Sequence, residues 1–408
     1  MGLLELNYDL TEEQRALQAA TREFCMAVWR PAAVELDKLA DPADVIAPGS
    51  VFWDVLRQTY QLGYHRRNLP RELGGEGLDP LSGILMSEEM GYASADFAIT
   101  LGVSAFPFNF ARMSPDPRVQ DMARQFSEDT EARMIGCWAI TEPDHGSDWL
   151  LSAEGSDNPK RAPQVRARLD GDEYVVNGQK SSWVSNGTIA THAALFLNLD
   201  PSAGMTGNGI AAIPLDYPGI TRGKPWNKLG QRALNQGEIF FDNVRIPREN
   251  VVCTDPATYR MLAEGTLASA NAGMGNLFVG VAQAALDEAL RYAGERVQGG
   301  KVIFEHQSVK ARLFDMFTQV EAARSLARRV SLYNSQASVP GLQYSIASKV
   351  FATETAFKVA SQAIQIFGGI GLSRDSVIEK IFRDARAAMI EDGVNETLAL
   401  AGADKLRE

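Results

Sequence analysis

The sequence predicts an α+β fold in which two helical blocks flank a central β domain. Apolar residues recur at helical spacing near both ends of the chain. Between them, short alternating segments are separated by turn clusters, a pattern typical of an antiparallel barrel or sandwich. We therefore expect an N-terminal α-helical domain over residues 1–133, a central antiparallel β-barrel domain over 134–252 and a C-terminal four-helix bundle over 253–408.

The N-terminal block opens with a clear helix start. Thr11 and Gln14 have the spacing of a capping box, and helical periodicity then runs from about residue 12 to residue 39. Pro31 lies inside this run and is expected to kink or divide the helix, because proline lacks a backbone N–H. Further helices are expected near 51–62, 81–94, 97–112 and 117–130.

The other two blocks are delimited by turn residues. Strands are expected at 165–169, 174–177, 193–199, 210–215 and 238–241, with turns at Asn177-Gly178 and Asn186-Gly187 among others. Helices are expected at 261–297, 304–335, 342–365 and 376–406.

Composition narrows the classes of protein that fit. The net charge of −11 does not favour a nucleic-acid partner. The three cysteines are widely separated, which indicates a reducing compartment, and the four histidines lack ligand spacing, so no metal site is expected. No apolar run is long enough to span a bilayer, and the first residues lack a targeting pattern. We expect a cytoplasmic location.

The most informative segment is the run 137–148, CWAITEPDHGSD. An apolar strand ends at Thr141 in a turn with hydroxyls, carboxylates and Gly146, which permits close backbone approach. Free N–H groups in such a turn could meet an anion or a polar ring edge. The segment could therefore form the floor of a site for a planar, phosphate-bearing cofactor, or it could be an ordinary exit from a strand.

This run resembles the TEP-x-x-GSD signature of the acyl-CoA dehydrogenase family, flavoenzymes that bind FAD. The resemblance implies the three-block fold and an FAD cofactor. It also implies that Trp138, Ile140 and Thr141 border the isoalloxazine, and that Gly146 and Ser147 lie near the pyrophosphate and the thioester arm.

A second motif, VNGQKSSWVSNG over 176–187, resembles the family's NG-x-K-x-W-x-[ST]-N-G strand. By that resemblance Trp183 packs on the flavin ring and Ser185 reaches its N5 edge. Ring packing suits an aromatic cofactor, whereas ordinary core filling is the alternative for Trp183.

A third set of residues is expected to serve a neighbouring subunit. The run 296–307 resembles the family's R-x-x-F-G-x-x-[IL]-x-x-x-Q loop, with Gly299 where phenylalanine is common. The resemblance places Arg296 on the FAD pyrophosphate of another protomer, with Gln307 nearby, and places Gln365 and Gly369 near the adenine half. A guanidinium fork suits a pyrophosphate. A homo-oligomer follows, usually a tetramer in this family.

The run 383–393 resembles the family's R-D-x-x-x-x-x-I-x-E-G, in which the glutamate is often the catalytic base. Counting without gaps places Asp392 at the base position, with a side chain roughly 1.5 Å shorter than glutamate. Glu391 is the alternative if the turn is shifted. A base on another helix or an acid pair that only caps a helix also stay open, although the region around Ala270 offers no carboxylate. In the family, aspartate occurs in a minority, some of which act on cyclic acyl-CoAs.

The resemblance implies α,β-dehydrogenation of an acyl-CoA thioester. Straight, branched and cyclic acyl groups all stay open, and a cyclic or bulky group is a minor alternative that the aspartate suggests. Asp392 would remove the α-proton, the β-hydride would pass to flavin N5, and electrons would leave to an electron-transfer flavoprotein. Its backbone N–H would polarise the thioester carbonyl. The alternatives are other CoA-ester chemistry, such as oxidase, decarboxylating or desulfinating activity, and a flavin-binding structural or assembly protein that has lost catalysis.

Overall fold

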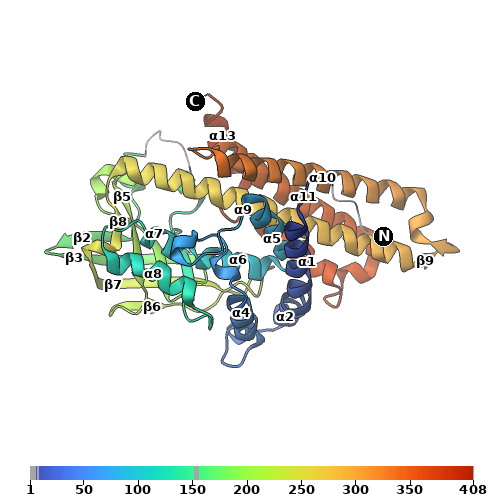
Figure 1. The fold of residues 1–408 in the computed structure, drawn as a ribbon, viewed down its shortest axis with the longest axis horizontal. Coiled ribbons are helices and arrows are strands. Elements are labelled where there is room, and N and C mark those ends of the chain that lie inside the picture. Colours follow the sequence, from blue (N-terminus) through green and yellow to red (C-terminus); the bar gives the residue numbers. More distant parts are fainter. Residues whose placement is uncertain (1–5, 7–8, 151–155, 408) are drawn as a thin grey trace.

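The computed structural model describes residue 6 and residues 9–150 and 156–407. Figure 1 shows the long C-terminal helices running along the molecule, the strands gathered at one end and the N-terminal helices packed beside them. The expected succession of helical, β and helical blocks is confirmed. The N-terminal helices are α1 (Glu12–Phe24), α2 (Arg30–Asp37), α3 (Pro42–Val45), α4 (Val51–Gln61), α5 (Pro80–Ala93), α6 (Ala95–Ser104), α7 (Phe106–Ala111) and α8 (Pro117–Glu128).

The first helix begins as predicted and is divided near its proline. The Thr11 hydroxyl accepts from the Gln14 N–H at 3.1 Å, and the Gln14 side chain accepts from the Thr11 N–H at 3.1 Å. A π-helical turn, Cys25–Trp29, precedes α2, and the Arg30 N–H donates to the Cys25 carbonyl. Pro31 cannot donate, and its ring would press on the carbonyl four residues earlier, so the wider turn lets the helix continue in a shifted register.

The central domain is a β domain, as expected, but its sheet is mixed. The strands run in the order β6-β7-β3-β2-β4-β5-β8, and β1 pairs with β4. The β1–β4 and β2–β4 pairings are parallel, which corrects the purely antiparallel prediction. The strands are β1 (Gly136–Ala139), β2 (Arg166–Asp170), β3 (Glu173–Ser185), β4 (His192–Asn198), β5 (Asn208–Pro214), β6 (Ile220–Arg222), β7 (Gln236–Pro247) and β8 (Val251–Cys253).

Strand β3 runs through one of the predicted turns. Asn177-Gly178 was expected to separate two strands, yet β3 continues past it with a bulge between Val176 and Gly178. Gly178 has φ 134°, and a Cβ there would lie 2.7 Å from the Val165 Cα. Glycine therefore forms a bulge rather than a hairpin, and it keeps the strand carrying Trp183 in one piece.

The C-terminal domain is helical as predicted, with one division. It contains α9 (Pro256–Glu295), α10 (Gln307–Gln336), α11 (Leu342–Phe367), α12 (Val377–Ala388) and α13 (Asn395–Asp404), and a short hairpin of β9 (Val297–Gln298) and β10 (Lys301–Val302) joins α9 to α10. The helix expected over 376–406 is broken after Ala388, and Asp392 and Gly393 in the connecting segment have φ of 50° and 98°. Two successive left-handed residues turn the backbone out of the helix. The candidate base thus lies on a turn between α12 and α13.

Apolar side chains pack the N-terminal and C-terminal helical domains against each other. The largest apolar cluster combines buried side chains from the N-terminal helices with those of α9, α11 and α12, and a second cluster fills the sheet. In the described part of the chain, no helix is long and apolar enough to cross a membrane.

Candidate functional site

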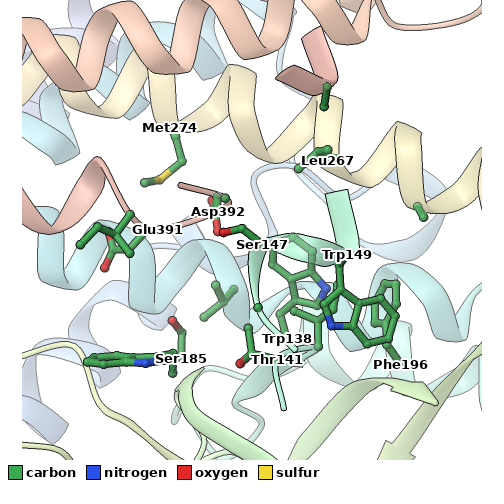
Figure 2. A pocket seen from close by; sticks show the side chains of 18 of the residues that line it. Trp138, Thr141, Ser147, Trp149, Ser185, Phe196, Leu267, Met274, Glu391 and Asp392 are labelled. Atoms are coloured by element: carbon green, nitrogen blue, oxygen red, sulfur yellow. The ribbon is translucent and has the colours of Figure 1, made fainter. Parts of the chain in front are cut away.

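A cavity of about 1240 Å³ lies where the β domain meets α6, α9 and the turn between α12 and α13. Residues from motifs more than two hundred positions apart in the sequence line it together, as Figure 2 shows for several of them. The predicted site residues that line this cavity are Trp138, Ile140, Thr141, Gly146, Ser147, Trp183, Ser185, Glu391 and Asp392.

The exit from β1 is held by a buried ion pair. Lys180 Nζ lies 2.7 Å from Glu142 Oε1 and also donates to the Ile140 carbonyl at 2.9 Å. The Glu142 carboxylate further accepts the N–H groups of Gln164 at 2.5 Å and Val165 at 3.2 Å. Both side chains of the pair are inaccessible to solvent. Lys180 and Glu142 therefore fix the shape of the turn, and their role is structural.

The turn at 145–148 differs from the sequence prediction in one respect. The Gly146 N–H donates to Asp148 Oδ1 at 2.7 Å, so it is not free to meet an anion. The space above Gly146 is open, because a Cβ there would meet nothing within 4 Å. The Ser147 hydroxyl accepts the Val394 N–H at 3.0 Å and so ties this turn to the one that carries Asp392. Gly146 thus offers room for a ligand, and Ser147 joins two parts of the wall.

The two motif tryptophans lie in different surroundings. Trp138 stacks on Phe106, with ring centroids 4.9 Å apart and an interplanar angle of 13°, and lies 6.3 Å from Phe196. Trp183 is 57% exposed and lies 6.1 Å from Trp226, which is 43% exposed. Ordinary core filling is therefore wrong for Trp183. Its exposed ring lies in the cavity wall, where it can pack against a planar aromatic group.

Ser185 belongs to a short polar chain. Its hydroxyl accepts from Gln236 Nε2 at 3.1 Å, and Gln236 Oε1 accepts from Lys228 Nζ at 2.8 Å. Lys228 also donates to the Leu234 carbonyl at 2.7 Å. Burial lowers the pKa of Lys228 to about 8. This chain orients the Ser185 hydroxyl at the cavity wall.

The turn that carries Asp392 is fixed through its backbone. Lys349 Nζ donates to the Gly393 carbonyl at 2.8 Å and to Asn395 Oδ1 at 2.7 Å, and Asn271 Nδ2 donates to the Asp392 carbonyl at 3.3 Å. Figure 2 shows Asp392 beside Ser147. Burial raises the pKa of Asp392, and the neighbouring Lys349 ammonium opposes that rise. Burial lowers the pKa of Lys349 itself to about 8.

Glu391 is held separately. Gln231 Nε2 donates to Glu391 Oε2 at 2.8 Å, and Figure 2 shows Glu391 lying apart from Asp392. Burial raises the pKa of Glu391 to about 7, although Gln231 and Lys228 oppose the rise. Two carboxylates with raised pKa values from successive residues thus line one cavity, where such groups are often functional.

The remaining predicted residues lie elsewhere. Arg296, Gln307, Gln365 and Gly369 are exposed and do not line the cavity. Arg296 directly follows α9 and Gln307 begins α10, while Gln365 lies in the last turn of α11 and Gly369 in the 3₁₀ turn after it. Tyr292 and Phe367 stack with centroids 4.2 Å apart, which brings the ends of α9 and α11 together. These residues therefore share one end of the helical domain without reaching their own chain's cavity.

Several residues that shape the site were missed at the sequence level. Lys349, Gln231 and Asn271 are completely buried and hold the turn or its carboxylates. The apolar periodicity of α11 could have revealed Lys349, because it lies three residues after Ile346 and three before Ala352 on the same apolar stripe. A lysine at such a position requires partners. Gln231 carried no comparable signal.

Comparisons with known proteins agree with this geometry. Models of the acyl-CoA dehydrogenase N-terminal, middle and C-terminal domains match residues 11–109, 137–244 and 261–406. The chain is 31% identical over 398 residues to the short-chain specific acyl-CoA dehydrogenase of Rattus norvegicus mitochondria, covering 97% of this chain and 90% of that protein. It is 30% identical over 389 residues to the cyclohex-1-ene-1-carbonyl-CoA dehydrogenase of Geobacter metallireducens, covering 95% and 96% of the two chains.

A solved structure shows the same fold. Butyryl-CoA dehydrogenase from Megasphaera elsdenii superposes with a TM-score of 0.85 at 27% identity, covering 99% of this chain and 100% of that one. The three domain matches and the full-length relatives together show that this chain belongs to the acyl-CoA dehydrogenase family of FAD-dependent flavoenzymes.

Proposed function

We propose that this enzyme catalyses the α,β-dehydrogenation of an acyl-CoA thioester, with Asp392 as the base that removes the α-proton. The observation that carries the proposal is the placement of Asp392. Its backbone is fixed by Asn271, while its side chain lines the cavity and has no hydrogen bond or ion pair within the described residues. A base must be free to approach the proton it abstracts, and a raised pKa makes the carboxylate a stronger base.

The cavity offers groups that fit FAD. Trp183 offers an exposed ring, Ser185 a hydroxyl held by Gln236, and Gly146 open space that a side chain would occupy. Trp138, Ile140 and Thr141 form an adjoining wall. When bound there, FAD supplies the acceptor for the β-hydride. The chain itself holds the thioester against the base, and we assign to the Asp392 backbone N–H the polarisation of the thioester carbonyl.

The acyl group is proposed to be cyclic or bulky. A cavity of about 1240 Å³ has room for both a flavin ring and a broad acyl group. Aspartate in the base position is shorter than glutamate by roughly 1.5 Å, so the α-carbon must approach the turn more closely. The relative in Geobacter metallireducens is named for a cyclic substrate, which supports the same assignment.

We further propose a homotetramer in which each FAD touches two chains. Arg296, Gln307, Gln365 and Gly369 are exposed at one end of the helical domain and do not line their own chain's cavity. Arg296→Ala should therefore lower FAD retention although Arg296 lies outside that cavity. In mixed oligomers of Arg296→Ala chains and Trp183→Ala chains, FAD retention should partly recover. Some sites then combine an intact Trp183 from one chain with an intact Arg296 from the other. Equal FAD content in Arg296→Ala and wild-type protein would contradict a shared site.

An electron-transfer flavoprotein as acceptor and a cytoplasmic location stay predictions, as do the domain limits at residues 133 and 252. The prediction that an electron-transfer flavoprotein accepts the electrons rests on the family resemblance. Reduced enzyme should reoxidise rapidly with that flavoprotein and slowly with oxygen. Rapid reoxidation by oxygen would indicate an oxidase instead.

The experiment that tests the proposed function is an anaerobic titration of the holoenzyme with straight-chain, branched and cyclic acyl-CoAs. Loss of the oxidised flavin absorbance identifies a substrate. The acyl skeleton whose CoA ester reduces the flavin fastest identifies the acyl class. We expect cyclic acyl-CoAs to bleach the flavin fastest. A yellow protein that no thioester bleaches would overturn dehydrogenation.

A further inference from the structure

Glu391 is a second carboxylate in the wall of a cavity to which apolar side chains also contribute. Ile99 and Val103 of α6 and Met274 of α9 contribute aliphatic and thioether surface to the same cavity. A carboxylate among such groups is costly unless hydrogen bonds compensate it. Figure 2 shows Glu391 and Met274 on the side of Asp392 away from Trp149 and Phe196. The hydrogen bonds that Glu391 forms, and those it lacks, therefore determine what it can do in the cavity.

A buried clamp sets the orientation of Glu391. Gln231 is completely buried with φ 49°, and its Nε2 donates to Glu391 Oε2 at 2.8 Å. The Gln231 N–H donates to Asp384 Oδ1 at 2.5 Å. Lys380 Nζ donates to Asp384 Oδ2 at 2.6 Å and to Asp96 Oδ1 at 2.8 Å. Glu391 is thus anchored through a polar network that reaches α6, the helix that also supplies Ile99.

In the part of the chain that the structure describes, the hydrogen bond from Gln231 leaves most acceptor positions of the Glu391 carboxylate unoccupied. An ionised carboxylate has about four acceptor positions, and Gln231 supplies the one donor to Glu391 found in the described residues. The other oxygen, Oε1, has no hydrogen bond or ion pair there. Since Glu391 lines the cavity, a donor on a bound molecule can fill these positions.

We propose that Glu391 is a specificity-determining residue that accepts a hydrogen bond from a hydroxyl group on the acyl part of the substrate. The inference rests on the proposed function, because Asp392 at the α-carbon would place the acyl part of the substrate in the cavity that Glu391 also lines. A neutral donor fits better than an ammonium. Lys228 and Lys349 already act electrostatically on Glu391, so an ammonium on the substrate would be a third cation near this carboxylate.

The test compares matched acyl-CoA pairs that differ only by one hydroxyl. The first pair is cyclohexane-1-carbonyl-CoA and its 4-hydroxy derivative, and the hydroxyl is then moved along the skeleton that bleaches the flavin fastest. The primary readout is the kcat/KM for flavin reduction by the hydroxylated acyl-CoA divided by the kcat/KM for the acyl-CoA without the hydroxyl. A second readout is the ratio of dissociation constants for the corresponding unreactive S-alkyl-CoA thioethers, measured by calorimetry on the holoenzyme.

We expect the wild-type ratio to favour one hydroxylated compound by about tenfold or more, as for hydrogen bonds to charged groups. In Glu391→Leu the ratio should fall to about one, and in Glu391→Gln, which preserves shape and one acceptor oxygen, to an intermediate value. Glu264→Leu is the matched control. It removes a carboxylate of the same cavity that is paired with Arg260 at 3.1 Å and Lys405 at 3.3 Å, so the ratio should stay at its wild-type value.

Two results would overturn the inference. One is a wild-type enzyme that shows no hydroxyl preference at any position in either readout. The other is a Glu391→Leu variant that binds FAD and keeps the wild-type ratio. If no acyl-CoA bleaches the flavin, the proposed dehydrogenation fails, and the thioether binding ratio still decides the role of Glu391. Bleaching without any hydroxyl preference leaves dehydrogenation intact and rejects this inference alone.

Discussion

The assignment of Asp392 as the base is tested most directly by Asp392→Asn. Asparagine has nearly the same shape and, like aspartate, tolerates the left-handed conformation that residue 392 adopts at φ 50°. The hydrogen bonds that hold the turn go to the backbone oxygens of residues 392 and 393. The substitution therefore removes the proton acceptor and leaves the turn in place.

The expected magnitude follows from this separation. Loss of a positioned general base should lower the rate constant of flavin reduction by about 10² to 10⁴-fold, while the Tm of the holoenzyme changes little. Asp392→Ala should lose the same activity and also lower stability by about 1 kcal/mol, because alanine is strained in the left-handed region. Glu391→Gln should slow reduction less than Asp392→Asn does.

The assay is anaerobic stopped-flow mixing of each holoenzyme with the best acyl-CoA of the titration panel. Flavin content and thermal unfolding, measured on the same samples, separate lost chemistry from lost structure. An Asp392→Asn enzyme that binds FAD and reduces it at near wild-type rate would refute the assignment. If Glu391→Gln were then the slow variant, Glu391 would be the base.

Three further outcomes are expected. Because burial raises the pKa of Asp392 and the base must be ionised, flavin reduction should slow as pH falls through that pKa; a flat rate profile would contradict this. Lys349→Met removes two hydrogen bonds to the Asp392 turn and should cost about 2–6 kcal/mol in chemical denaturation, whereas Lys358→Met, exposed on the same helix, should stay within about 0.5 kcal/mol. Gly178→Ala should lower Tm, because the new Cβ would lie 2.7 Å from the Val165 Cα. The control Gly83→Ala, which has open space in α5, should leave Tm unchanged or raise it. Equal Tm changes in the two variants would contradict the need for glycine at the bulge.

Much of the fold followed from local patterns. The capping box at Thr11 and the three-block order appear as predicted, because capping and periodicity depend on residues a few positions apart. The parallel β1–β4 pairing and the bulge at Gly178 did not follow, since they depend on segments that meet only after folding. The break at Asp392 was also missed. Two left-handed residues inside a helical pattern leave no mark on its apolar periodicity.

The sequence by itself determined which residues stand at the motif positions, including an aspartate where the family often has glutamate. Only the tertiary structure decided how these residues meet. Ser147 bonds to Val394 across 247 positions, and Gln231 orients Glu391 across 160. Such contacts depend on the packing of whole domains, and no local spacing encodes them. Burial, which sets the pKa values of the two carboxylates, likewise exists only once the helices and the sheet enclose the cavity.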